Sequence, residues 1–234
     1  MYNVQNKTVM ITGAAGGLGY KYAEILLHND AKSVAVVDLP TSNGQKAAAT
    51  LENEFGKGRA VFLACDVTKA DDLEKTFKKI VDAFEGLDIL INNAGILNDN
   101  FWEETIDLNV KALIRGSMLA FDYMGKHKGG KGFSQSLASM YDKTGVRVVI
   151  MCPGATATSL ITTISDKICD SVRIVLGSNT ANLDKDSKQA VNNVSLAMLN
   201  LIQKGKNGAT WVSEYNQPPY AVDFPHYSKR SLPV

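Results

Sequence analysis

Three glycines stand at a spacing that suits a phosphate-binding turn. The short apolar run Thr8–Thr12 leads directly into Gly13, Gly17 and Gly19, which form a G-x-x-x-G-x-G pattern. Such a tight turn needs residues without a Cβ, so that the backbone can approach a pyrophosphate. A helix that begins near Tyr20 would then present free N–H groups to the phosphates. The alternative interpretation is a plain glycine-rich turn.

A carboxylate ends the second apolar run of the sequence. Asp38 closes the run Ser33–Asp38 and lies nineteen residues after Gly19. A carboxylate at this position can accept hydrogen bonds from an adenosine ribose, and its charge repels a 2′-phosphate. Leu39 follows it, and neither Arg nor Lys lies within the glycine turn, so the sequence favours NAD over NADP as cofactor. The alternative is that Asp38 only opens the next turn.

These residues lie between short apolar runs and helical patterns that alternate along the chain. The apolar runs are typical of strands covered on both faces, and they span residues 8–12, 33–38, 60–64, 89–92, 146–151 and 208–212. Helical spacing between them is clearest in Leu73, Phe77, Ile80 and Phe84. The alternation predicts an α/β fold, a single Rossmann-type doubly wound parallel sheet with helices on both faces. We expect one dinucleotide-binding domain over residues 1–212 and an irregular, proline-rich arm over residues 213–234.

Composition and charge exclude several classes of protein. The chain has 234 residues, 45% hydrophobic and 21% charged, with a formal net charge of +1, so it has no general attraction to nucleic acid or anionic membranes. Its three cysteines and three histidines lie far apart, which argues against a metal site or a disulfide framework and favours a reducing compartment. No apolar stretch is long enough to span a membrane. We therefore expect a cytoplasmic protein that binds neither nucleic acid nor membranes.

Further motifs occur in an order that is similar to a known family. Besides the glycines, they are Asp66-Val67, the run Asn92-Asn93-Ala94-Gly95, Asn109 and Pro153-Gly154. Together they resemble the short-chain dehydrogenase/reductase family over nearly the whole chain. Residues 95–99 and 207–211 resemble its insect alcohol dehydrogenase branch, which includes proteins named for 15-hydroxyprostaglandin dehydrogenase and non-enzymatic larval fat-body proteins.

The resemblance implies an oxidoreductase that uses a nicotinamide cofactor, here NAD, on a secondary alcohol or ketone, commonly as a homodimer. It implies that Asn109 holds a proton-relay water in the active site and that Thr158 fixes the nicotinamide carboxamide. The alternatives are an Asn109 satisfied by a cap or by the core, and a Thr158 that is an ordinary polar turn residue. The cofactor-binding residues carried over from the family pattern are Gly13, Ala15, Gly17, Leu18, Gly19, Asp38, Asp66, Val67, Asn93, Ala94, Gly95, Pro153, Gly154 and Thr158.

One departure from the family pattern concerns the catalytic residues. The resemblance implies a Ser, and a Tyr followed four residues later by a Lys, with the Tyr acting as general base on the substrate hydroxyl. None of the eight tyrosines in this sequence has a Lys at that spacing. Tyr141 and Lys143 are two residues apart and would point to different sides of a helix. Asn109 is therefore the one catalytic residue of the family pattern that we can assign.

The lost segment is expected between Gly132 and Phe133. In the family pattern, a strand, a loop and half a helix, about 25–30 residues, would stand there. The sheet should then have one strand fewer. This leaves either a gap of about 9–10 Å or a strand over residues 146–151 that moves to pair with residues 89–92. Two functions stay open: an NAD-dependent oxidoreductase whose chemistry is impaired in this chain, and a non-catalytic NAD-binding or structural relative.

Overall fold

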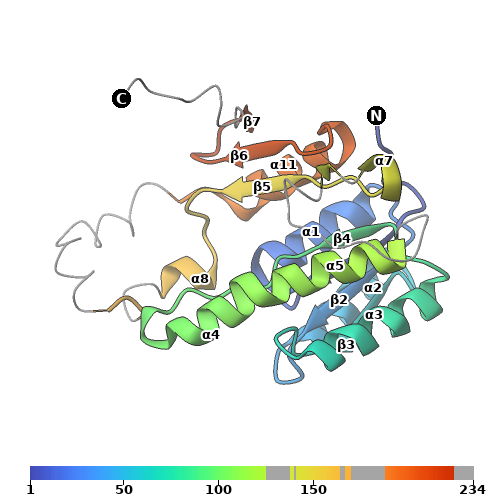
Figure 1. The fold of residues 1–234 in the computed structure, drawn as a ribbon, viewed down its shortest axis with the longest axis horizontal. Helices are drawn as coiled ribbons and strands as arrows, with labels where there is room; N and C mark the ends of the chain where they lie inside the picture. Colours follow the sequence, from blue (N-terminus) through green and yellow to red (C-terminus); the bar gives the residue numbers. More distant parts are fainter. Residues whose placement is uncertain (125–137, 140, 164–166, 170–187, 224–234) are drawn as a thin grey trace.

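The computed structural model describes residues 1–124, 138–139, 141–163, 167–169 and 188–223. Strands and helices alternate through the chain, and helices cover the main sheet (Figure 1). The strands are β1 (Thr8–Thr12), β2 (Ser33–Asp38), β3 (Ala60–Ala64), β4 (Ile89–Ile91), β5 (Ile150–Pro153), β6 (Thr210–Ser213) and β7 (Tyr220–Val222). The α-helices are α1 (Gly17–His28), α2 (Gly44–Phe55), α3 (Ala70–Phe84), α4 (Trp102–Ile106), α5 (Leu113–Met124), α7 (Tyr141–Thr144), α8 (Ser159–Thr162) and α11 (Val191–Lys204).

Four parallel strands form the first sheet, in the order β3-β2-β1-β4. Successive side chains of a strand point to opposite faces, so β1 supplies two cores. Val9 and Ile11 pack in a cluster with residues of α1, α2 and α11, whereas Met10 packs with Phe77 of α3. The predicted α/β fold, with a parallel sheet wound on both faces, is therefore confirmed.

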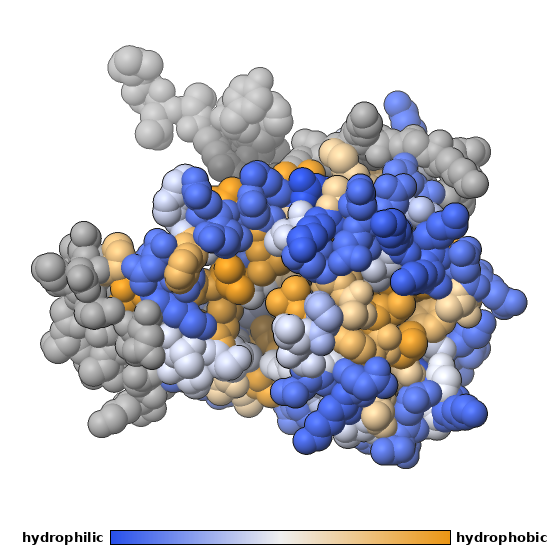
Figure 2. All heavy atoms as spheres, turned by 90° about the horizontal axis from the view of Figure 1, so that it is seen from below, coloured by the Kyte–Doolittle hydropathy of each residue, from blue (hydrophilic) through white to orange (hydrophobic). Residues whose placement is uncertain are grey.

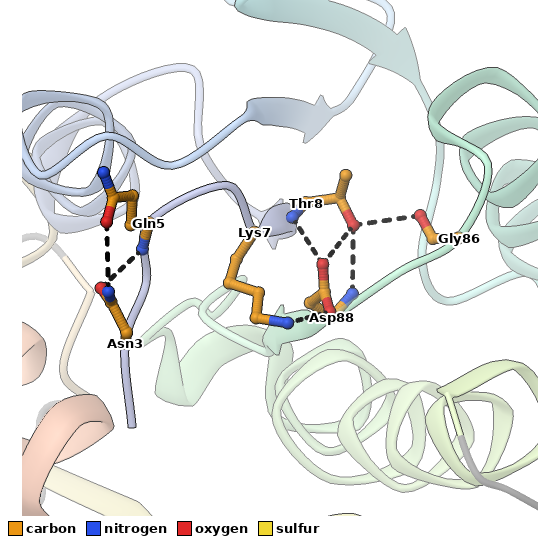
Figure 3. A network of polar contacts seen from close by, with 6 residues as sticks. All are labelled: Asn3, Gln5, Lys7, Thr8, Gly86 and Asp88. Carbon is orange, nitrogen blue, oxygen red and sulfur yellow. Dashed lines mark hydrogen bonds and ion pairs between the residues drawn. The ribbon is translucent and has the colours of Figure 1, made fainter. Parts of the chain in front are cut away.

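A polar cluster links the beginnings of β1 and β4 (Figure 3). The Asp88 carboxylate accepts hydrogen bonds from the Thr8 N–H at 2.9 Å, the Thr8 hydroxyl at 3.1 Å and the Lys7 ammonium at 2.9 Å. Partial burial alone would raise the pKa of Asp88, but the hydrogen bonds from Thr8 and Lys7 outweigh it and lower that pKa. These contacts hold β4 in register beside β1.

The remaining strands form a second, separate sheet in the order β5-β6-β7. β5 and β6 are parallel, and β7 is antiparallel to β6, although it lies in the segment expected to be an irregular arm. Strand β5 begins at Ile150 and not at Val146, and among the described strands it pairs only with β6. The expected single sheet is thus divided between β4 and β5. Of the two arrangements foreseen for a missing strand, the described residues adopt the one with a gap.

The gap is a cavity of about 740 Å³ between residues 87–92 and residues 145–151. The sheet divides here because no described strand lies between β4 and β5 to connect their hydrogen-bond ladders. Figure 2 shows the molecule from below relative to Figure 1, and on this face apolar side chains gather around a hollow near the middle. The residues that line the cavity between β4 and β5 include apolar side chains of α5 and α11. The position of the expected deletion, between Gly132 and Phe133, lies outside the described residues.

One further finding concerns membranes. Among the described helices, none is both long and apolar enough to cross a lipid bilayer.

Candidate dinucleotide-binding site

The glycine turn between β1 and α1 packs backbone against backbone. Gly13 and Gly17 have φ of +65° and +56°, in the left-handed region that favours glycine. A Cβ on Gly13 would lie 2.8 Å from the Ala94 Cα, and a Cβ on Gly19 would lie 2.4 Å from the Gly13 carbonyl oxygen. Gly13 and Gly19 therefore stand where a side chain cannot be accommodated without movement of the loop.

The loop after β4 is joined to this turn by hydrogen bonds. The Thr12 hydroxyl accepts the N–H groups of Asn93 and Ala94 at 3.0 and 3.1 Å. In return, the Asn93 amide donates to the carbonyl oxygens of Thr12 and Gly13 at 3.0 and 3.1 Å. Thr12 was not among the residues predicted for the site, although its place directly before the first glycine was a usable signal.

Asp38 lies at the carboxyl end of β2 with its side chain turned to the glycine turn. One carboxylate oxygen accepts the Ala15 N–H at 2.9 Å, and the other accepts the Leu39 N–H at 2.8 Å. Each carboxylate oxygen has a second lone pair that can accept a further hydrogen bond. No described cation forms an ion pair with Asp38. The hydrogen bonds from Ala15 and Leu39 thus orient the Asp38 carboxylate beside the glycine turn.

Asp66 and Val67 follow β3 and take part in local structure. The Asp66 carboxylate accepts the Thr68 hydroxyl at 2.6 Å and the Thr68 N–H at 3.1 Å, and Lys69 lies 3.5 Å away. The hydrogen bond from the Thr68 hydroxyl is the main reason that the pKa of Asp66 is lowered. Val67 is buried in the core with Phe77. Both Thr68 bonds reach one carboxylate oxygen, so the other oxygen, which lies near Lys69, can still accept a hydrogen bond.

Asn109 lies in a π-helix, Asp107–Ala112, that joins α4 to α5. Its amide donates to the Ile96 carbonyl at 2.7 Å and accepts the Ile96 N–H at 2.9 Å. A Cβ on Gly95 would lie 3.3 Å from its side-chain oxygen. Asn109 therefore clamps the loop after Gly95. Both interpretations of Asn109, the proton-relay residue and the side chain satisfied by a cap or by the core, stay predictions.

Thr158 lies next to the glycine turn, in the segment that follows the second sheet's strand β5. It follows Pro153, the last residue of β5, and immediately precedes α8. Its side-chain methyl carbon lies 3.7 Å from where a Cβ of Gly17 would be. Gly154 packs closely on Glu214, since a Cβ there would be 2.7 Å from the Glu214 Cβ. The structure thus brings the loops after β1, β2, β4 and β5 to one edge of the fold.

A sequence model described as "short chain dehydrogenase" matches residues 7–131, more than half of the chain. The chain belongs to the short chain dehydrogenase family. The 15-hydroxyprostaglandin dehydrogenase [NAD(+)] of Rattus norvegicus is 35% identical over 194 residues, which cover 69% of this chain and 73% of the relative. Alcohol dehydrogenase 1 of Ceratitis cosyra is 28% identical over 243 residues, 90% of this chain and 93% of the relative. The chain is therefore a member of an oxidoreductase family, and this membership implies a nicotinamide cofactor.

Solved structures support the same fold. A short chain dehydrogenase from Burkholderia cenocepacia in complex with NADP has a TM-score of 0.70 at 21% identity and covers 91% of this chain and 98% of its own. A dehydrogenase/reductase from Sinorhizobium meliloti has a TM-score of 0.72 at 20% identity and covers 90% and 94%. At these identities the likeness concerns the fold, which is the α/β architecture expected from the sequence.

The alignments also show where the lengths differ. For the rat enzyme, 69% of 234 residues is about 161, fewer by about 33 than the 194 aligned positions. The bovine enzyme aligns over 130 positions with 56% of this chain, about 131 residues, so that stretch has no net gap. The rat enzyme therefore has about 33 residues without a counterpart in this chain. They lie outside the stretch of about 131 residues that aligns with the bovine enzyme without a net gap.

Tyr141 and Lys143 lie far from the glycine turn. Both belong to α7, which Figure 1 shows beside the N-terminus, whereas α8, which follows Thr158, lies at the other end of the fold. Tyr141 lines the cavity together with Tyr2 and Arg147. In this family member, the described tyrosine and lysine of α7 are thus remote from the carboxyl edge where the cofactor loops meet.

A buried glutamine holds the loop that carries Thr158. Gln189 is fully buried, and its amide donates to the Thr156 hydroxyl at 3.3 Å and to the Ser213 carbonyl oxygen. Its backbone N–H donates to the Ala155 carbonyl at 2.9 Å. No motif in the sequence indicated this residue, because the partners of Gln189 come from two distant segments.

Proposed function

We propose that the chain binds NAD(H) at the glycine turn, with Asp38 beside the adenosine ribose. The observation that carries this proposal is the Asp38 carboxylate, which accepts the Ala15 N–H at the end of β2 and has no described ion-pair partner. A carboxylate so held can accept ribose hydroxyls and repels a 2′-phosphate, which supports NAD over NADP. The name of the rat relative, a dehydrogenase of NAD(+), agrees with this preference.

The phosphates would lie at the start of α1. Gly16 and Gly17 supply backbone there without side chains, and the first turn of α1 contains no acidic residue. The unpaired N–H groups and the dipole of a helix start favour an anion. Thr158, close to Gly17, would then face the nicotinamide side of the site. Bound NAD would supply hydride acceptance, and these residues would hold and orient it.

The proposed reaction class is oxidation of a secondary alcohol or reduction of a ketone, as the names of the relatives suggest. Such a reaction needs a base within reach of the substrate hydroxyl. No described Tyr–Lys pair has the spacing of the family pattern, and Tyr141 lies away from the cofactor loops. We therefore propose that this 234-residue chain binds the cofactor with impaired or no turnover, and that a form with the additional segment would be the active dehydrogenase.

A cytoplasmic location and a homodimer belong to the same proposal. The three cysteines form no disulfide with one another, which suits a reducing compartment. Sedimentation of the purified chain would test the dimer.

Titration of NADH fluorescence tests the cofactor proposal. We expect NADH to bind at least about tenfold more tightly than NADPH, since the 2′-phosphate would meet the Asp38 charge. Asp38→Asn should remove most of that preference, whereas Asp82→Asn, on the exposed side of α3, should leave it unchanged. A folded chain without NADH binding would contradict the proposal. If the same samples form NADH from secondary alcohols, the proposal of impaired turnover is wrong, but the proposal of NAD binding stands.

A further inference from the structure

The cavity between β4 and β5 has the walls of a missing strand. It measures about 740 Å³, and the two segments that flank it are residues 87–92 and 145–151. At about 3.3 Å per residue, either segment is long enough to pair with five or six extended residues. Figure 1 shows β4 and β5 running in the same direction, and the strand order places β1 beside β4 and β6 beside β5.

Backbone groups of both strands face this cavity. In β4, the Asp88 N–H donates to the Thr8 carbonyl at 3.1 Å, and alternate residues of a parallel strand bond to the same side. Ile89 and Ile91 therefore direct their N–H and C=O groups away from β1 and into the cavity. No described strand pairs with that edge of β4.

The edge of β5 has the same arrangement. The Ile150 N–H donates to the Ala209 carbonyl, and the Gly154 N–H donates to the Ser213 carbonyl, both at 2.8 Å. Val149 and Met151, which alternate with Ile150, therefore direct their backbone groups into the cavity. Within the described part of the chain, β5 pairs only with β6. Two parallel edges whose donors and acceptors pair with no described strand thus face one another, which is the condition for strand addition.

Most side chains of the floor and roof of the cavity are apolar, although Ser117 of α5 and Gln203 of α11 also line it. Helix α5 contributes Leu113, Ala120 and Phe121 to the lining, and α11 contributes Met198 and Ile202. A strand between two helical layers buries side chains on both of its faces. The occupant of this space should therefore be apolar on both of its faces along most of its length.

The amino end of the groove is positively charged. Asp88 is already paired with Lys7 there (Figure 3). Arg147 donates to the carbonyl oxygens of Ile202 and Gly205, and no described carboxylate forms an ion pair with Arg147. Lys204 also lines this end and is hydrogen-bonded only to an amide oxygen among the contacts described for it. An acidic residue at the amino end of a parallel strand would complement these cations.

We propose that this groove binds an extended segment of another polypeptide, about five β-branched or aliphatic residues preceded by acidic ones, lying parallel to β4 and β5. Hydrogen bonds to both edges would hold its backbone, and the side chains of α5 and α11 would cover its two faces. The site is separate from the glycine turn, so this binding does not depend on NAD.

A fluorescent peptide, acetyl-Asp-Glu-Val-Ile-Val-Ile-Val, tests the proposal with the full chain by anisotropy. We expect saturable binding. A proline in place of the central valine keeps the hydrophobicity and removes a donor, and it should weaken binding by about tenfold or more. Lysines in place of the two acids should weaken binding several-fold, and added salt should reduce this difference. Equal binding of the proline peptide, or no saturable binding, would overturn the proposal.

A variant of the groove provides an independent test. Ala120→Trp on α5 would fill the cavity and should abolish peptide binding, whereas Ala49→Trp, on an exposed position of α2, should leave it unchanged. NADH titration of both variants reports whether the cofactor half is folded. If Ala120→Trp retains NADH binding and also retains peptide binding, the groove is not the binding site. If sedimentation shows that the wild-type chain dimerises and that the dimer excludes the peptide, a second copy is the occupant and the assignment to another polypeptide is wrong.

Discussion

The half of the molecule built on β1–β4 and the half built on β5–β7 are held together in different ways. In the first half, β1 is buried throughout, and Thr12 and Asn93 join the loops at its carboxyl edge. In the second half, strands of three or four residues form a separate sheet, and β5 contains no buried residue. The glycine-turn site therefore lies in the half whose strands are the more deeply buried.

The second half is joined to the first by α11 and is held together internally by Arg147. Helix α11 packs against α1 through Val194 and Ile202, and Arg147 ties the segment before β5 to the end of α11. A strand with a neighbour on both sides is held by two hydrogen-bond ladders. Among the described residues, β5 has a neighbour on one side only and is held by one ladder. We expect the two halves to respond differently to the same kind of substitution.

The largest effect is expected from truncation of aromatic side chains in the two halves. Phe77 is fully buried between α3 and the first sheet, so Phe77→Ala should cost about 3–5 kcal/mol in free energy of unfolding. Trp211 in β6 is only partly buried, and Trp211→Ala should cost roughly half as much. Urea denaturation of both variants measures this difference; equal costs would remove the contrast between the halves.

The glycine turn allows a matched pair of alanine substitutions. Gly19→Ala would place a Cβ 2.4 Å from the Gly13 carbonyl oxygen, and we expect a loss of about 1–3 kcal/mol. Gly16 has an extended φ of −173° and nothing within 4 Å of a Cβ, so Gly16→Ala should leave the unfolding free energy nearly unchanged. Thermal unfolding of the two variants compares them directly. A Gly19→Ala variant as stable as wild type would show that the turn is not tightly packed.

Arg147→Gln sharpens the comparison between the halves. The substitution removes hydrogen bonds to the Ile202 and Gly205 carbonyls and should cost about 1–2 kcal/mol. Amide hydrogen exchange should accelerate in β5 and β6 and stay slow in β1 and β2. Equal acceleration in both sheets would mean that the halves unfold as one unit.

The smallest effect concerns pH and the polar cluster of the first half. The lowered pKa of Asp88 means that its contribution to stability is present above its unfolded pKa, about 3.9, and is lost as the pH falls through its folded pKa. Asp88→Asn should therefore cost about 1 kcal/mol at neutral pH, and the difference from wild type should vanish in acid. Denaturation curves across this pH range measure it; a cost independent of pH would exclude the charge as its origin.

Much of the cofactor half could be predicted from the sequence. The glycine spacing, the apolar runs of β1 to β4 and the helical pattern of Leu73 and Phe77 are local signals, because backbone geometry and burial on both faces restrict the residue types at each position. Asp38 was found in the same way, by its place at the end of a strand. Such features need no knowledge of distant parts of the chain.

Only the tertiary structure decided how the two halves meet. Whether β5 would pair with β4 or leave a gap depends on competition between strand edges far apart in the sequence, and the observed β5 stays with β6. Likewise, β7, the clamp between Asn109 and Ile96 and the burial of Gln189 arise from partners that no local pattern identifies. The amino-acid sequence by itself determined the elements and the nucleotide turn, because these follow from neighbouring residues. Long-range packing alone decided the divided sheet and its groove, because these follow from which surfaces are left to bury.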